Sequence, residues 1–174
     1  MGIDLGRLKE PFPEKEIKWR VQQQGEYNGN PWATVLAYIE SRTLMDRLDE
    51  VVGAENWTNR FERAPEGGIL CTIGIKTNGT DEWIYKTDGA ENTKVEAIKG
   101  GLSDAFKRAG VQWGVCRYLY RLPHTFAKFD DNGKYKTRIE GQTYKWNPPQ
   151  LIEFGKEFLP PEKPNKTKTT NKGE

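Results

Sequence analysis

The chain has 174 residues, of which 35% are apolar, and its 27 Lys and Arg against 25 Asp and Glu give a net charge of +2. This length predicts one domain, and the small net charge excludes a histone-like polycation. No apolar run reaches about 18 residues, which excludes a transmembrane helix, and one histidine with two distant cysteines leaves no zinc-ligand spacing. We expect a cytoplasmic protein, because the first ten residues lack the apolar stretch of a signal peptide.

The N-terminal part predicts two helices with a strand between them. Ile17 and Val21 share one helical face, and Ser41 and Gly53 are suited to cap the start and the end of the second helix. In chain order we expect a helix over 13–22, a Gly/Asn-rich loop over 25–31, a strand over 32–39 and a helix over 42–52.

Three closely spaced strands and a helix follow. Alternating side chains and the turn pairs Gly67-Gly68 and Asn78-Gly79 predict an antiparallel meander. Its strands are expected over 57–63, 69–76 and 82–88, and an amphipathic helix over 94–110. The fold class is therefore α+β, a β-β-β-α core with flanking helices in one domain.

The C-terminal third is polar. We expect a hairpin over 128–145 about Asn132-Gly133, then a short helix from Pro148 to near Phe158. From Pro160 onward the Lys/Thr/Asn/Pro composition predicts disorder. The predicted organisation is a folded domain over 1–159 and a disordered basic tail over 160–174.

Positive charge gathers on the helix after the meander and on the segment beyond it. Residues 94–121 have a net charge of +4, from Lys94, Lys99, Lys107, Arg108, Arg117 and Arg121 against Glu96 and Asp104. Cations on one rim suit phosphates. The structural alternative is a solvated helix face on which Asp104 pairs with Arg108. The abundant aromatic side chains either stack on bases or pack in the core.

Enzyme patterns are nearly absent, and the chain is not expected to be an enzyme. It has neither a Walker phosphate loop nor a G-x-S-x-G motif. Asp88 and Glu96 leave a metal-dependent nuclease as an alternative. The order helix, three strands, helix also occurs in double-stranded RNA-binding domains, so a duplex-RNA binding module is the second alternative.

Six motifs in order resemble one family of recombination proteins. They are the stretches 11–20, 37–42, 45–57, 86–90, 99–109 and 114–120, which include Tyr-Ile-Glu-Ser-Arg at 38–42 and Lys-Arg at 107–108. Together, across about residues 8–126, they resemble the Rad52-type single-strand annealing proteins, in particular their bacterial and phage branch. Duplex-RNA binding becomes a minor alternative.

The resemblance implies a function in homologous recombination or DNA repair. It implies a β-β-β-α core, ring or arc homo-oligomers, and annealing of complementary DNA strands without ATP, cofactor or metal. Single-stranded DNA is the implied partner, and a recombination or single-strand-binding protein is a further candidate partner. The setting would be a bacterial or phage-infected cell.

The resemblance also implies which residues bind the DNA backbone. Arg42 matches an arginine that contacts the backbone, Lys107 and Arg108 match a Lys-Arg pair lining the same groove, and Lys99 matches a basic position one helix face earlier. Val111 stands where the family has a further arginine. Additional candidates for DNA binding are Lys86, Arg117 and Arg121.

Overall fold

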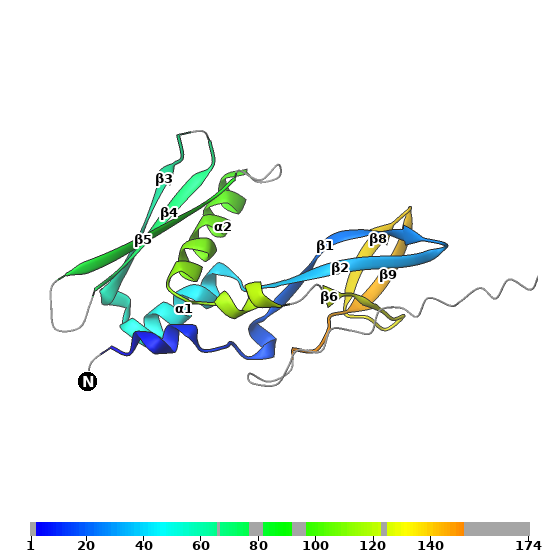
Figure 1. The fold of residues 1–174 in the computed structure, drawn as a ribbon, viewed down its shortest axis with the longest axis horizontal. Helices are drawn as coiled ribbons and strands as arrows, with labels where there is room; N and C mark the ends of the chain where they lie inside the picture. The colour runs from blue at the N-terminus through cyan, green and yellow to red at the C-terminus, as the bar shows by residue number, and fades with distance from the viewer. Residues whose placement is uncertain (1–2, 66, 77–81, 92–96, 123–124, 152–174) are drawn as a thin grey trace, which may run out of the picture. The chain divides into compact units, whose positions relative to one another are not determined.

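The computed structural model describes residues 3–65, 67–76, 82–91, 97–122 and 125–151 (Figure 1). In this part of the chain no helix is long and apolar enough to cross a membrane. The main elements are β1 (Lys18–Tyr27), β2 (Asn30–Tyr38), α1 (Ser41–Val52), β3 (Trp57–Arg63), β4 (Ile69–Lys76), β5 (Trp83–Ala90), α2 (Ala97–Gln112), β6 (Thr125–Phe126), β7 (Lys128–Phe129), β8 (Tyr135–Ile139) and β9 (Gln142–Asn147).

The backbone divides into two compact units. Unit 1 comprises Met1–Arg20 and Ala37–Arg121, and unit 2 comprises Val21–Leu36 and Leu122–Glu174. Strands β1 and β2 contribute residues to both units. Each unit has its own buried side chains.

Unit 1 contains the expected β-β-β-α core. Strands β3, β4 and β5 form an antiparallel sheet in that order, and α2 packs across β4 and β5 (Figure 1). Cys71 and Ile73 of β4 are completely buried, and Phe106 of α2 is 2% exposed with its ring 6.1 Å from that of Trp57. The α+β class and the meander are confirmed. The Asn78-Gly79 turn lies outside the described residues.

The helix predicted over 13–22 is wrong. Glu14–Glu16 makes one turn of 3-10 helix, and the chain then enters β1, which pairs with β2. Ile17 and Trp19 are buried whereas Arg20 is exposed, so burial follows the two-residue period of a strand. The predicted loop contains the turn of this hairpin, in which Asn28 and Gly29 both have positive φ, as tight hairpin turns require.

Unit 2 is built from two small sheets, with the strand orders β1-β2-β6 and β7-β9-β8. The hairpin predicted about Asn132-Gly133 is misplaced. The paired hairpin is β8 and β9, and Glu140 and Gly141 at its turn have φ values of 45° and 86°. The segment containing Asn132 connects β7 to β8, and β7 pairs with β9. Most of the helix predicted to end near Phe158 lies outside the described residues. The predicted tail lies wholly outside them.

Candidate nucleic-acid interface

The start of α1 and the middle of α2 meet through two hydroxyl groups. Ser41 Oγ lies 2.8 Å from Ser103 Oγ. Ser41 was predicted to be the N-cap of α1, but it is the first helical residue and Glu40 precedes it, so its hydroxyl is used between the helices. Lys99 and Lys107 lie four residues before and after Ser103, on the same face of α2.

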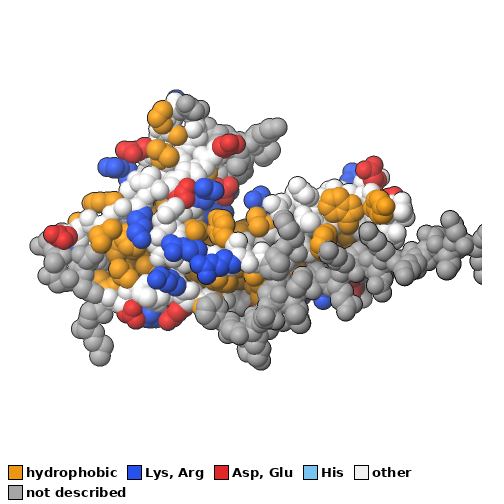
Figure 2. Space-filling view, viewed as in Figure 1, with side chains coloured by type: hydrophobic (Ala, Val, Ile, Leu, Met, Phe, Trp, Pro, Cys, Tyr) orange, Lys and Arg blue, Asp and Glu red, His pale blue; other side chains and the backbone are white. Residues whose placement is uncertain are grey.

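This contact brings three of the predicted DNA-binding residues to one part of unit 1. Arg42 follows Ser41 directly and is exposed, Lys99 is exposed, and Lys107 is partly exposed. We call Arg42, Lys99 and Lys107 the basic face. Figure 2 shows Lys and Arg side chains gathered over the region of unit 1 that contains α2.

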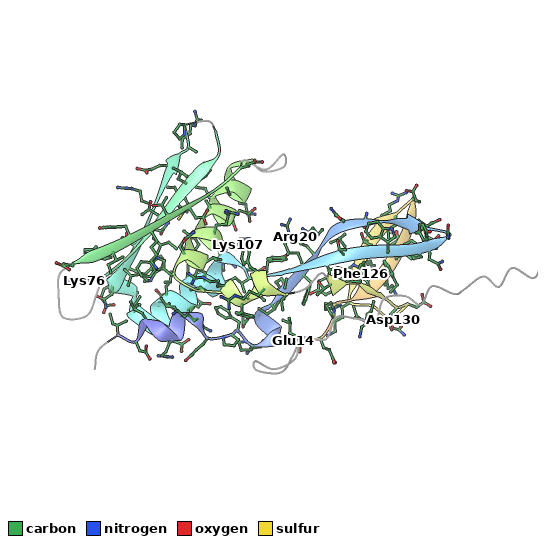
Figure 3. All side chains as sticks on the ribbon, in the orientation of Figure 1. Glu14, Arg20, Lys76, Lys107, Phe126 and Asp130 are labelled. Atoms are coloured by element: carbon green, nitrogen blue, oxygen red, sulfur yellow. The ribbon has the colours of Figure 1, made fainter. Side chains whose placement is uncertain are left out.

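The ammonium group of Lys107 has two neighbours. Its Nζ lies 2.9 Å from Asp104 Oδ1 and 5.4 Å from the centre of the Tyr38 ring. Figure 3 shows Lys107 on α2, near α1 and the end of β2. Sequence reasoning missed Tyr38 as part of the site, although it belongs to the Tyr-Ile-Glu-Ser-Arg motif. The cation–π contact and the carboxylate together hold the charge at the surface.

Arg108 points to β5. Its Nη2 and Nε both lie 3.1 Å from Asp88 Oδ1, and Gln112 Nε2 donates to Asp88 Oδ2 at 3.0 Å. The predicted pair between Asp104 and Arg108 is wrong, because Asp104 pairs with Lys107 one residue earlier. The Arg108 guanidinium therefore connects α2 to β5 of the sheet through an ion pair, whereas Lys107 belongs to the basic face.

The pKa of Asp88 lies below its ordinary value of 3.8. Burial alone would raise this pKa, but the hydrogen bonds from Gln112 and the Gly89 N–H, together with the charge and hydrogen bond of Arg108, lower it. A carboxyl group whose pKa is depressed in the folded state stabilises the fold above its unfolded pKa. The stabilisation is lost as the pH falls through the folded pKa.

Replacing Asp88 by asparagine is therefore expected to lower the free energy of unfolding at pH 7 by about 1 kcal/mol, because the Arg108 charge loses its partner. The difference from the wild type should shrink as the pH falls below 3.8. Urea denaturation at both pH values, followed by tryptophan fluorescence, measures it. Asp46→Asn, at an exposed position of α1, serves as the control, and an equal loss in this variant would contradict the role given to Asp88.

Two of the additional candidates, Arg117 and Lys86, donate hydrogen bonds to carbonyl groups at the C-terminal end of α2. Arg117 donates through Nη2 to the carbonyls of Val111 and Gln112 at 2.8 and 2.9 Å. Lys86 Nζ donates to the Gln112 carbonyl at 3.0 Å and lies 4.4 Å from the centre of the Trp113 ring. Cations at a helix C-terminus satisfy its last carbonyls and favour its dipole. Arg121, the third additional candidate, is exposed at the end of the turn Arg117–Arg121.

Of the two residues behind the nuclease alternative, the structure describes Asp88. Both oxygens of Asp88 already accept hydrogen bonds from side chains, and Glu96 lies outside the described residues. Within the described ranges no three His, Cys, Asp or Glu side chains are grouped to hold a metal ion. Burial raises the pKa of both Cys71 and Cys116 to about 12, with the Arg47 charge acting in the opposite direction at Cys116, so both thiols stay protonated at neutral pH.

In unit 1 an antiparallel sheet is backed by α2, and Lys99 and Lys107 lie along one face of this helix. Comparison with known proteins agrees with the motifs. The model of the Rad52/22 family double-strand break repair protein matches residues 5–138, and the chain belongs to this family.

Two relatives from Deinococcus are both named single-stranded DNA-binding protein DdrA. The protein from Deinococcus radiodurans is 32% identical over 132 residues, which cover 72% of this chain and 58% of the relative. The protein from Deinococcus deserti is 28% identical over 156 residues, which cover 86% of this chain and 68% of the relative. The chain thus spans less than two thirds of the length of the first relative.

Proposed function

We propose that this protein binds single-stranded DNA and anneals complementary strands in recombination or repair, without ATP. The observation that carries the proposal is the basic face, brought together by the Ser41–Ser103 contact in a member of the Rad52/22 family. The names of the two Deinococcus proteins support DNA as the ligand, and their bacterial source fits the expected cytoplasm of a bacterial or phage-infected cell.

The chemistry of the basic face suits annealing. Ammonium and guanidinium groups bind phosphates and leave the Watson–Crick edges of the bases free to pair.

Three cations per copy hold a strand weakly. We propose that copies assemble into a ring or arc, so that their basic faces form one groove and many weak contacts act together. Residues 1–159 would form the annealing module, and the tail over 160–174 would add nonspecific attraction to DNA.

In this proposal another arginine takes the place of the one that the resemblance implies at position 111, where this chain has Val111. Arg117 lies against the Val111 carbonyl, with Nε at 3.0 Å and Nη2 at 2.8 Å, and the side chain is exposed. A guanidinium has five donors, so it can hold this carbonyl and still face a phosphate. We infer that Arg117 supplies the guanidinium that the resemblance implies at position 111.

The proposal is tested by mixing complementary strands that carry donor and acceptor fluorophores, with and without protein and without ATP. Faster pairing of intact strands, also in magnesium or manganese, is the expected result. Cleavage of the strands in either metal would support the nuclease alternative instead. Preferential binding of duplex RNA in competition with single strands would support the duplex-RNA alternative.

Asp104 is expected to weaken DNA binding, because its carboxylate competes with phosphate for Lys107. The variant Asp104→Asn removes this competitor, and affinity for single-stranded DNA should rise by about two- to fivefold, the range of an exposed ion pair. Anisotropy titration of a labelled strand measures the change. Glu62→Gln is the matched control, since Glu62 pairs with Arg60 on β3 at 3.4 Å; an equal gain in both variants would mean that net charge alone is responsible.

A further inference from the structure

The sheet β7-β9-β8 of unit 2 has two chemically different faces. Register places Trp146 of β9 opposite Tyr135 of β8 and Phe129 of β7, and the Tyr135 and Trp146 rings are stacked with centres 4.6 Å apart. Trp146 is 1% exposed, so this aromatic face is the inner one. Because side chains alternate along a strand, the residues between these aromatic ones lie on the outer face.

The outer face is strongly basic. Its exposed cations, which we call the outer cations, are Lys128, Lys134, Lys136, Arg138 and Lys145. Asp130 follows β7 directly and continues the same alternation, and its Oδ1 accepts a hydrogen bond from the Asn132 N–H at 2.7 Å. The acidic residues Asp131 and Glu140 lie in the two turns.

The arrangement of these charges opposes folding rather than supporting it. Lys136 lies directly opposite Lys145 in the register of β8 and β9, and like charges at opposite positions destabilise a sheet. Within the described part of the chain no ion pair joins an outer cation to a carboxylate; Arg138 and Lys145 donate instead to the carbonyls of Gly141 and Asp131. On the basic face, by contrast, Lys107 has Asp104.

We propose that the outer cations bind the phosphate backbone of single-stranded DNA, as a second contact surface in addition to the basic face. Lys134, Lys136 and Arg138 are two residues apart along one edge, hence about 6.7 Å from each other, a regular row of cations suited to a repeating row of phosphates. The proposal rests on the proposed function. It concerns a sheet whose strand β9 lies beyond the segment 5–138 that the family model matches.

The test uses the full chain with Lys128→Gln, Lys134→Gln and Lys136→Gln combined, because Arg138 and Lys145 also hold turns. The matched control carries Lys15→Gln, Arg60→Gln and Arg63→Gln, three exposed cations of unit 1 with the same total charge change. Binding of a labelled oligothymidylate is measured by anisotropy over a series of salt concentrations, and folding by urea denaturation.

The outer-cation variant is expected to bind at least about tenfold more weakly, with a salt dependence reduced by about two units of slope for three lost phosphate contacts. Its denaturation midpoint should equal or exceed that of the wild type, because the Lys136–Lys145 repulsion is gone. Affinity and slope equal to those of the control would overturn the proposal, and an acidic protein would then be the partner to test. If Arg42→Ala with Lys107→Ala leaves binding intact while the outer-cation variant loses it, the basic face fails as the proposed site and the outer cations stand.

Discussion

Replacing Arg42 and Lys107 together by alanine is expected to lower the affinity for single-stranded DNA by about fiftyfold. Each side chain would lose a phosphate contact of about 1.2 kcal/mol, about 2.4 kcal/mol for the two, and 1.4 kcal/mol corresponds to a factor of ten. The slope of log affinity against log salt should decrease by about 1.4, or 0.7 for each lost contact. Anisotropy titrations over a range of salt concentrations measure both quantities.

The fold of this double variant should remain intact, because Arg42 is exposed and Lys107 contacts two partly exposed groups, Asp104 and the Tyr38 ring. Arg60→Ala with Arg63→Ala removes the same charge from exposed positions of β3 and serves as the control. The effect on long strands should exceed that on short ones if several copies bind one strand. Titration curves that overlay those of the control would refute the assignment of the basic face.

Replacing Phe106 by alanine is expected to cost about 3–5 kcal/mol of unfolding free energy, the range for a buried phenylalanine. The side chain is 2% exposed, and its ring lies 6.1 Å from that of Trp57 at the start of β3. The resulting cavity would lie between α2 and the sheet, in the core that places Lys107. Since whole domains are stable by about 5–15 kcal/mol, this one change should remove a large part of the total.

Phe106→Leu is the graded companion of this variant. It keeps an apolar side chain in the same place, and a smaller loss of about 1–1.5 kcal/mol is expected. Urea denaturation followed by tryptophan fluorescence reports the loss, and the leucine variant should keep wild-type DNA affinity below its denaturation midpoint. Equal, small losses in both variants would show that α2 does not pack on the sheet as described.

The meander could be predicted from the sequence because its signals are local. Cys71, Ile73 and Ile75 alternate with other residues, and the pairs Gly67-Gly68 and Asn78-Gly79 predict the turns. The first strand was missed because Ile17 and Val21 are four residues apart, a spacing that fits one helical face and also every second position of a strand. Only the pairing of β1 with β2 decides between the two periods.

The candidate site could be predicted only in part, because some of its signals are local and others depend on contacts between distant elements. The motifs predict Arg42 and Lys107, and the local net charge favours the helix that carries Lys107. The start of α1, which carries Arg42, contacts the middle of α2 through Ser41 and Ser103, which are 62 residues apart in sequence. Helical spacing suggested that Asp104 pairs four residues ahead, but the geometry of β5 gives Arg108 a different partner, Asp88. Contacts between elements distant in sequence leave no local periodic signal.

The charge that bears on DNA binding in this protein is local, and the net charge of the chain does not reveal it. The net charge of the chain is +2, yet α2 and the sheet β7-β9-β8 each gather cations on one side. Unit 1 balances several of its cations with carboxylates, as in Lys107–Asp104 and Arg108–Asp88. A single copy with such faces would hold DNA weakly, and the proposed function therefore depends on several copies acting on one strand.

The mass of the free particle and of its complex with single-stranded DNA tests this dependence most directly. Light scattering coupled to size-exclusion chromatography gives both masses. The account predicts a particle of several 20.0 kDa chains that retains or increases its number of copies when it binds a strand. A monomer in both states, with one chain per strand, would contradict it.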